Sequence, residues 1–252
     1  MELGLEGKVA LITGAGSQVG FGKGIALILA GYGCDIVVND IDAGGIQKTA
    51  AEVEALGRRA MAVKADVTRV AEVRDMVKNA LDSFGRIDIL VNNAGRTTTP
   101  TPFVDTPEEN WKIVIDLNLY GVFHCTKAVL PQMIERRSGK IVNIASGAGI
   151  SGMPRCVHYG ATKAAVIAFT RGLAKEVISQ GINVNAVAPG VGDTNFLRTG
   201  NFPEGELDRA VATVPSKRPT TPRDVGNMVA YLCSDLADQI VGQTFLVDGG
   251  HV

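Results

Sequence analysis

The sequence of 252 residues carries 25 Lys and Arg against 26 Asp and Glu, and no basic run gives it the charge that nucleic-acid binding requires. A hydrophobic fraction of 46% provides a buried core and excludes an intrinsically disordered chain. The 30 glycines, about 12% of the chain against roughly 7% in average proteins, indicate many tight turns or close backbone approaches.

Short apolar runs alternate with longer amphipathic stretches along the whole chain. The runs are rich in β-branched residues, which is typical of parallel strands covered by helices on both faces. We predict strands at residues 8–13, 35–39, 60–65, 87–92, 140–146, 182–188 and 244–247. We predict helices at residues 22–31, 43–56, 69–84, 107–116, 118–137, 158–179 and 222–234. Gly57 is expected to end the second helix, and Thr106 to cap a helix that begins at Pro107.

Strand and helix in regular alternation predict an α/β fold, an open doubly wound (Rossmann) sheet of seven parallel strands with helices on both faces. No linker rich in Pro, Ser or Gly divides the chain, so we expect residues 1–252 to form a single domain. The irregular stretch is 190–221, which is long for a connection within a compact domain. We predict that this stretch is a substrate lid.

A glycine-rich segment follows the first strand at once and opens the first helix. Gly14, Gly20 and Gly22 would let the backbone pass close to a pyrophosphate, and the helix N-terminus would present its free N–H groups. A tight turn without a ligand would look similar, but the place between first strand and first helix favours a dinucleotide site.

Asp40 ends the second strand, where a carboxylate accepts hydrogen bonds from the adenosine ribose. It would repel a 2′-phosphate, and neither Ile41 nor its neighbours supply an arginine. The sequence therefore predicts NAD and not NADP as cofactor. The alternative is that Asp40 only caps the next helix.

Tyr159 and Lys163 stand four residues apart in a predicted helix, so both side chains lie on one face about one turn apart. An ammonium there is expected to lower the tyrosine pKa from about 10 towards neutrality, which would let Tyr159 exchange a proton with an alcohol or ketone oxygen. Ser146 ends the fifth strand, at the edge of the sheet where ligands bind. Its hydroxyl could donate to the substrate oxygen, or it could merely cap the following turn.

With these residues the chain resembles the short-chain dehydrogenase/reductase family, in its compact single-domain branch, from Lys8 to Gly250. The resemblance includes Asp66 in ADVT, the run Asn92-Asn93-Ala94-Gly95, Asn118 in DLNLYGVF, Pro189-Gly190 and the closing GQTFLVDGG. Each motif alone is modest. Their order, and their places on the expected elements, make the combination specific.

The resemblance implies a role for each residue. Tyr159 would be the general acid and base, Lys163 would also bond the nicotinamide ribose, Ser146 would orient the substrate oxygen, and Asn118 would hold a water linking Lys163 to solvent. The glycine pattern and the resemblance together assign the cofactor to Gly14, Ser17, Gln18, Gly20, Phe21, Gly22, Asp40, Ile41, Asp66, Val67, Asn92, Ala94, Gly95, Tyr159, Lys163, Pro189, Gly190, Gly192 and Thr194.

The chain departs from the family pattern at two places. Five residues separate Gly14 from Gly20 where the family usually has three, so we expect Gly16, Ser17 and Gln18 to bulge outward. Gly192 stands where the family often has a branched aliphatic residue, so we expect a looser turn around the nicotinamide.

We therefore expect an NAD-dependent oxidoreductase that interconverts a secondary alcohol and a ketone, acting on a small molecule. An anionic or acyl-CoA substrate would bind residues from among Arg96, Ser146, Met153 and Arg155, and the lid adds Arg198, Arg209, Lys217 and Arg218. Alternatively these cations are only solvated surface residues. Rival functions are reduction of 3-oxoacyl thioesters, a non-catalytic dinucleotide sensor, and an isomerase or lyase, for which the chain has no additional substrate domain.

The cysteines, histidines and apolar runs of the sequence predict the protein's partners and location. Four widely spaced cysteines indicate free thiols in a reducing compartment, and three scattered histidines give no metal site. We find no signal peptide and no bilayer-length apolar run, so we expect a cytoplasmic protein without a membrane partner. The resemblance implies a homotetramer, paired through helices 118–137 and 158–179. The small residues Ala161, Ala164, Ala165 and Ala168 would permit that pairing or serve an internal core.

Overall fold

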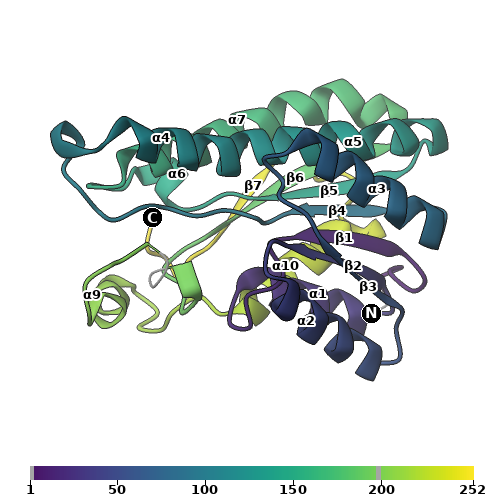
Figure 1. The fold of residues 1–252 in the computed structure, drawn as a ribbon, viewed down its shortest axis with the longest axis horizontal. Coiled ribbons are helices and arrows are strands. Elements are labelled where there is room, and N and C mark those ends of the chain that lie inside the picture. Colours follow the sequence, from purple (N-terminus) through teal and green to yellow (C-terminus); the bar gives the residue numbers. More distant parts are fainter. Residues whose placement is uncertain (1–2, 197–199) are drawn as a thin grey trace.

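The computed structural model describes residues 3–196 and 200–252. One sheet runs through the molecule in the order β3-β2-β1-β4-β5-β6-β7, and each neighbouring pair is parallel (Figure 1). Its strands are β1 (Val9–Thr13), β2 (Asp35–Asp40), β3 (Ala60–Lys64), β4 (Ile89–Asn92), β5 (Gly139–Ile144), β6 (Ile182–Pro189) and β7 (Thr244–Val247). The predicted seven-stranded parallel sheet is confirmed.

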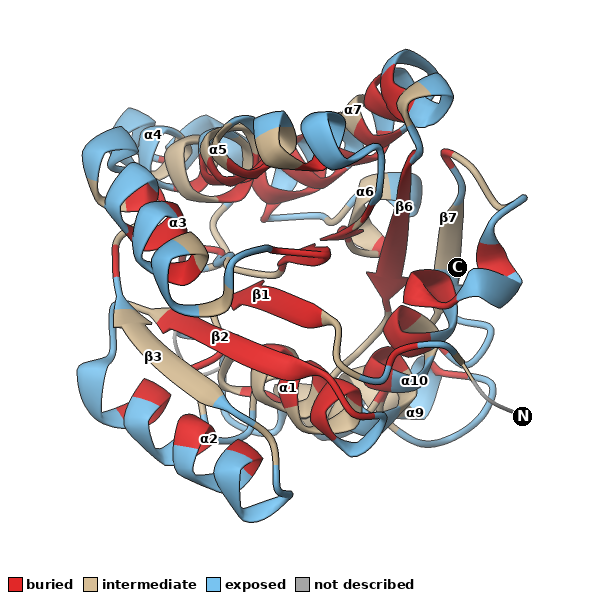
Figure 2. Cartoon of the chain, turned by 90° about the vertical axis from the view of Figure 1, so that its right-hand side faces the viewer, coloured by how far each residue is buried: buried red, intermediate tan, exposed pale blue. Residues whose placement is uncertain are grey.

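Helices cover both faces of the sheet. On one face lie α1 (Phe21–Gly31), α2 (Ala43–Ala55) and α10 (Pro222–Cys233); on the other lie α3 (Val70–Phe84), α5 (Gly121–Arg136) and α7 (Val157–Val177) (Figure 1). Successive residues of β1 serve the two cores in turn: Ala10 and Ile12 pack with α1 and α10, while Val9 and Leu11 pack with α3 and α5. The central strands are accordingly buried on both faces (Figure 2).

Of two predicted helix boundaries, the end at Gly57 is confirmed and the start at Thr106 is wrong. Gly57 follows the end of α2 with φ +79, as expected of a left-handed terminator. The predicted cap at Thr106 is wrong, because α4 (Glu108–Ile115) begins after Pro107 and receives no side-chain cap. The Thr106 hydroxyl instead donates to the Pro102 carbonyl at 3.0 Å, across the short 3-10 turn Phe103–Asp105.

The predicted helix 118–137 is α-helical only from Gly121. Residues Asp116–Tyr120 form a π-helical turn that joins α4 to α5 in one continuous rod. Two short helices were not predicted, α6 (Ala148–Ser151) and α9 (Glu206–Thr213), and the second lies within the irregular stretch 190–221. A π-helical turn inside a longer helix is frequently found at functional sites.

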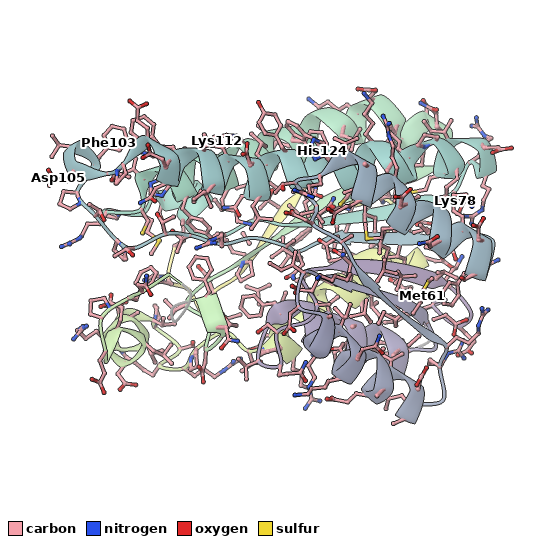
Figure 3. The ribbon with its side chains drawn as sticks, viewed as in Figure 1. Met61, Lys78, Phe103, Asp105, Lys112 and His124 are labelled. Atoms are coloured by element: carbon pink, nitrogen blue, oxygen red, sulfur yellow. The ribbon has the colours of Figure 1, made fainter. Side chains whose placement is uncertain are left out.

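The rod Glu108–Arg136 is long and apolar enough to cross a bilayer by length and composition alone. Its apolar residues Cys125, Val129 and Met133 are nevertheless buried in the core against the sheet. On the outer surface, Lys112 pairs with Asp116 at 2.5 Å (Figure 3). The rod is a core helix of this domain.

The four cysteines are all free and buried, as the sequence predicts. Burial raises the pKa of the Cys34 thiol to about 12 and that of Cys125 also to about 12. Both therefore remain protonated at neutral pH and act as small apolar side chains of the core.

Candidate active site

The glycine-rich turn after β1 is packed too tightly for side chains. A Cβ at Gly14, where φ is +66, would lie 2.7 Å from the Ala94 Cα, and one at Gly22 would lie 2.3 Å from the Gly14 carbonyl oxygen. Asn93 holds this turn, because its amide donates to the carbonyls of Thr13 and Gly14, both at 2.9 Å. The sequence motif contains Asn93 but gives no sign of this structural role.

The residues around the turn fit a dinucleotide. Helix α1 starts at Gly20 without a side-chain cap or an acidic residue in its first turn, so its N-terminal N–H groups suit a phosphate. At the end of β2, one Asp40 carboxylate oxygen accepts from the Gly16 N–H at 2.9 Å. The other accepts from the N–H groups of Ile41 at 2.7 Å and Asp42 at 3.2 Å. These donors fix the carboxylate next to the glycine turn.

The longer glycine loop does not bulge outward, so that prediction is wrong. The Gln18 amide donates to the carbonyls of Gly16 at 2.8 Å and Gly45 at 3.0 Å, which folds the loop back over the start of α2. On its other side, the Gln18 amide oxygen accepts from the Lys23 ammonium at 3.0 Å. A glutamine that bonds backbone carbonyls is not visible in the spacing of glycines.

The turn at Gly192 is not loose either, and the expectation is wrong for a specific reason. A Cβ at Gly192 would lie 2.5 Å from Cζ of Phe21, at the start of α1. The phenylalanine ring takes the space that a branched side chain at position 192 would need. Gly192 and Phe21 are therefore complementary in volume.

Ser146, Tyr159 and Lys163 come together at the carboxyl end of β5. Ser146 lies two residues beyond the strand, which ends at Ile144. Its hydroxyl accepts from the Ala148 N–H at 3.2 Å, and its side chain lies near enough to Tyr159 to lower the pKa of that residue. Tyr159 and Lys163 occupy the first turns of α7. The Lys163 ammonium donates to the Ile144 carbonyl at 2.8 Å and lies 5.8 Å from the centroid of the Tyr159 ring.

The pKa values of this group differ from the expectation. Burial raises the pKa of Tyr159 to about 12, although the neighbouring Ser146 side chain opposes the rise, and burial lowers the pKa of Lys163 to about 8. The predicted lowering of the tyrosine pKa is therefore not found in this structure. The physical reason is enclosure: Phe196 packs on Tyr159 with ring centroids 5.1 Å apart, and Lys163 is directed at a carbonyl.

Asn118 lies in the π-helical turn with its side chain fully buried. Its amide oxygen accepts from the Arg96 N–H at 2.9 Å, and its amide nitrogen donates to the Arg96 carbonyl at 2.9 Å and the Thr162 hydroxyl at 3.2 Å. A Cβ at Gly95 would lie 3.1 Å from the Asn118 amide oxygen and 3.3 Å from the Lys163 ammonium. Asn118 thus holds the segment after β4 beside Lys163; that it holds a water stays a prediction.

Asn92 is committed to the interior. Its side chain is 3% exposed and donates to the Thr126 hydroxyl at 3.0 Å and the Asn143 amide oxygen at 2.8 Å. It connects β4, β5 and α5, so any contact of Asn92 with a cofactor would fall to its backbone.

The other predicted cofactor residues follow the carboxyl ends of the strands. At Gly190 a Cβ would lie 2.7 Å from the Asp248 Cα, so a side chain is excluded there. The Asp66 carboxylate accepts from the N–H of Thr68 at 2.9 Å and from its hydroxyl at 2.8 Å, and Val67 is buried. The buried Thr194 follows β6. Their contacts with a cofactor stay predictions.

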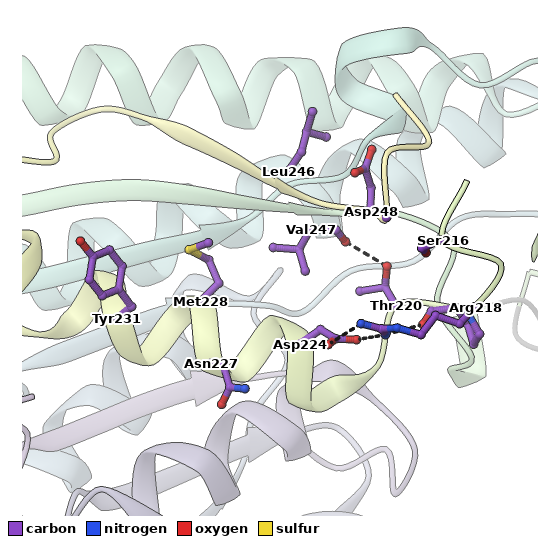
Figure 4. A pocket seen from close by; sticks show the side chains of 12 residues that line it. Ser216, Arg218, Thr220, Asp224, Asn227, Met228, Tyr231, Leu246, Val247 and Asp248 are labelled. Atoms are coloured by element: carbon purple, nitrogen blue, oxygen red, sulfur yellow. Dashed lines mark hydrogen bonds and ion pairs between the residues drawn. The ribbon is translucent and has the colours of Figure 1, made fainter. Parts of the chain in front are cut away.

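The structure sorts the candidate substrate cations. Arg209 pairs with Glu206 at 2.9 Å, and the Lys217 ammonium donates to the Ala212 carbonyl at 2.8 Å. Arg218 pairs with Asp224 at 2.6 Å on the wall of a cavity of about 510 Å³ between α10 and β7 (Figure 4). Arg198 lies outside the described residues.

Arg96 and Arg155 are the remaining candidate cations, and their guanidinium groups donate to the carbonyls of Thr97 at 3.4 Å and Pro100 at 3.3 Å. Arg96 and Arg155 are exposed, and in the described part of the chain neither forms an ion pair within 4.0 Å. Arg96 is the residue whose backbone Asn118 holds beside Lys163. Met153 packs with Tyr159 in one small apolar cluster. Phe196 and Phe202, from the stretch 190–221, pack against this cluster, and the sequence gives no sign of their contribution.

Comparison with known proteins agrees with this geometry. Residues 14–251 match the protein family described as enoyl-(acyl carrier protein) reductase. The chain is 44% identical to the 3-oxoacyl-[acyl-carrier-protein] reductase of Synechocystis, with 98% of each protein covered. It is 40% identical to the (2S)-[(R)-hydroxy(phenyl)methyl]succinyl-CoA dehydrogenase subunit BbsD of Thauera aromatica, covering 99% of this chain and 98% of that protein. The crystal structure of the Brucella melitensis 3-ketoacyl-(acyl-carrier-protein) reductase complexed with NADH superimposes with a TM-score of 0.91, at 37% identity and coverage of 98% and 99%.

Proposed function

The chain belongs to the short-chain dehydrogenase/reductase family and is an oxidoreductase acting on CH–OH groups with a nicotinamide dinucleotide; on this premise we propose that it reduces 3-oxoacyl thioesters with NADH. The reverse reaction would oxidise the corresponding secondary alcohol. This proposal takes the thioester reductase, one of the rival functions inferred from the sequence, as the main function, because the relatives carry that name.

The observation that carries the proposal is the Ser146–Tyr159–Lys163 arrangement beside the glycine turn. Bound NADH would supply the hydride. The Tyr159 hydroxyl would give its proton to the substrate oxygen, and the neighbouring Ser146 hydroxyl would orient that oxygen. Lys163, whose pKa of about 8 allows it to carry or release a proton near neutral pH, would resupply Tyr159. A non-catalytic dinucleotide sensor would need none of these groups.

NAD is proposed over NADP because of Asp40. Its carboxylate is fixed by three backbone N–H groups at the end of β2 and would repel a 2′-phosphate. Gly16 closes on this carboxylate, since a Cβ there would lie 2.9 Å from the Asp40 Cβ. Both the charge and the lack of space support the smaller cofactor.

A second candidate substrate class is favoured by Arg96 and Arg155. Two exposed guanidinium groups without an ion-pair partner in the described chain suit an additional carboxylate or the phosphates of coenzyme A. A hydroxyacyl-CoA with an acidic group, as in the name of the Thauera relative, combines both features. We therefore retain the anionic or acyl-CoA substrate predicted from the sequence as a second proposal.

The test is reduction of acetoacetyl-CoA, of an acidic 3-oxoacyl-CoA and of a neutral cyclic ketone, each with NADH and with NADPH. We expect the highest kcat/KM for a thioester with NADH. The Arg155→Ala and Arg96→Ala variants should lower kcat/KM for the acidic thioester more than for acetoacetyl-CoA. Turnover of the neutral ketone alone would reject the thioester, and a preference for NADPH would reject the role of Asp40.

A further inference from the structure

The longer glycine loop contacts the segment that follows β6. Its base is fixed, because the Gln18 amide bonds the Gly16 and Gly45 carbonyls and the Thr49 hydroxyl donates to the Ala15 carbonyl at 2.9 Å. The hydroxyl of Ser17 is thereby held at the outer end of the loop. This anchoring makes the position of Ser17 a property of the fold.

Ser17, which follows β1, forms a hydrogen bond with a residue that follows β6. The Asn195 amide donates to the Ser17 hydroxyl at 3.1 Å, although 178 residues separate the two in sequence. Asn195 stands six residues after the end of β6, in the segment that follows Thr194. A second contact joins the same two segments, since Phe21 fills the space above Gly192.

On the proposed function, the dinucleotide lies between these two segments, which form the walls of its site. One wall is the β1–α1 turn, which suits the pyrophosphate, and the other is the segment after β6. A side-chain bond between the walls must open whenever a dinucleotide enters or leaves. It is also a neutral hydrogen bond between partly buried groups, so it can open and re-form.

We propose that Ser17 and Asn195 form a clasp, a hydrogen bond that closes the crevice over the dinucleotide and slows its exchange. The clasp rests on the proposed function only in that the dinucleotide must bind. Ser17 and Asn195 are then positioning residues for the cofactor, and the two additional residues of the glycine loop are what bring Ser17 within reach.

The clasp and a simple phosphate contact by Ser17 predict different kinetics. The clasp would lie across the path of the dinucleotide in both directions, so its loss speeds both entry and release of NADH. A hydroxyl that only donates to a phosphate acts on the bound state, so its loss speeds release and leaves entry unchanged.

The experiment is stopped-flow fluorescence of NADH binding and release, which needs no substrate. One hydrogen bond of this kind predicts that Ser17→Ala speeds both steps by roughly two- to tenfold, with little change in Kd. Ser17→Thr keeps the hydroxyl and should restore both rates. In an Asn195→Ala background, Ser17→Ala should have no further effect, because the bond is already lost.

The matched control is Thr99→Val. The Thr99 hydroxyl accepts from the Asn201 amide at 3.2 Å, so it also ties the lid to the body of the protein, but away from the glycine loop. Thr99→Val should leave both NADH rates unchanged. If Ser17→Ala speeds release alone, or leaves both rates as in the wild type, or acts equally with and without Asn195, the clasp is rejected. If NADH does not bind to the wild type, the proposed function itself fails.

Discussion

Lys163 is a buried lysine whose charge would serve the proposed reaction but lowers the stability of the fold. Its side chain is 5% exposed, and burial lowers its pKa from 10.5 to about 8. A depressed pKa means that the folded chain binds the proton less well than the unfolded chain does. Lys163 therefore costs stability as the pH falls from about 10.5 through 8, and the cost is complete below pH 8.

This cost predicts that Lys163→Met stabilises the fold at neutral pH while it impairs catalysis. A methionine fills a similar volume without a charge, so we expect a gain in the free energy of unfolding of about 1–3 kcal/mol at pH 7. The gain should shrink at pH 10. Urea unfolding of both proteins at the two pH values measures it. A variant that is less stable than the wild type at pH 7 would contradict the assigned cost.

For single residues, the sequence predicts which side chains lie close together better than it predicts their pKa values. Tyr159 and Lys163 share a helix face and Ser146 follows a strand end, so local geometry suffices to bring them together. The raised pKa of Tyr159 is different, because it comes from burial, and Phe196 from the stretch 190–221 packs on the tyrosine ring. A contact between residues that far apart has no local signal in the sequence.

At the scale of elements, the start of α1 and the segment after β6 are fitted to each other. The Phe21 ring occupies the space that a side chain at position 192 would need. Gly192→Ala should therefore destabilise the protein by about 1–3 kcal/mol through overpacking.

Shortening the opposing side chain should relieve this clash. We expect Phe21→Leu combined with Gly192→Ala to be more stable than Gly192→Ala alone, and thermal unfolding of both single variants and the double variant measures the coupling. Additive losses in the double variant would show that the two positions do not share this space.

The elements that could be predicted are those with a strong repeating pattern. Buried β-branched runs located the strands, since both of their faces are covered. The cap at Thr106 failed because the helix starts one residue later than predicted, with Pro107 at its N-cap, and the Thr106 hydroxyl is bonded to the Pro102 carbonyl instead. The π-helical turn Asp116–Tyr120 and the path of the long glycine loop depend on hydrogen bonds, not on apolar spacing, and so left no pattern to read.

At the scale of the whole molecule, the outer face of α7 bears on assembly. Ala161, Ala164 and Ala168 are exposed, so they do not serve the internal core that the sequence left as an alternative. We propose that this face pairs with its equivalent in a homotetramer.

The substitution Ala164→Arg should then break the pairing and give smaller assemblies. Light scattering coupled to size-exclusion chromatography measures the mass in solution. Ala51→Arg, on the exposed face of α2, is the matched control and should leave the mass unchanged. An Ala164→Arg variant with the mass of the wild type would exclude this face from the assembly.

The most direct test of the enzyme's chemistry is the turnover of Tyr159→Phe. Phenylalanine keeps the packing against Phe196 and removes only the hydroxyl. With a substrate that the wild type reduces, we expect kcat to fall by about 10²–10⁴-fold while NADH still binds. If Tyr159→Phe reduces that substrate at the rate of the wild type, Tyr159 is not the proton donor and the proposed mechanism is wrong.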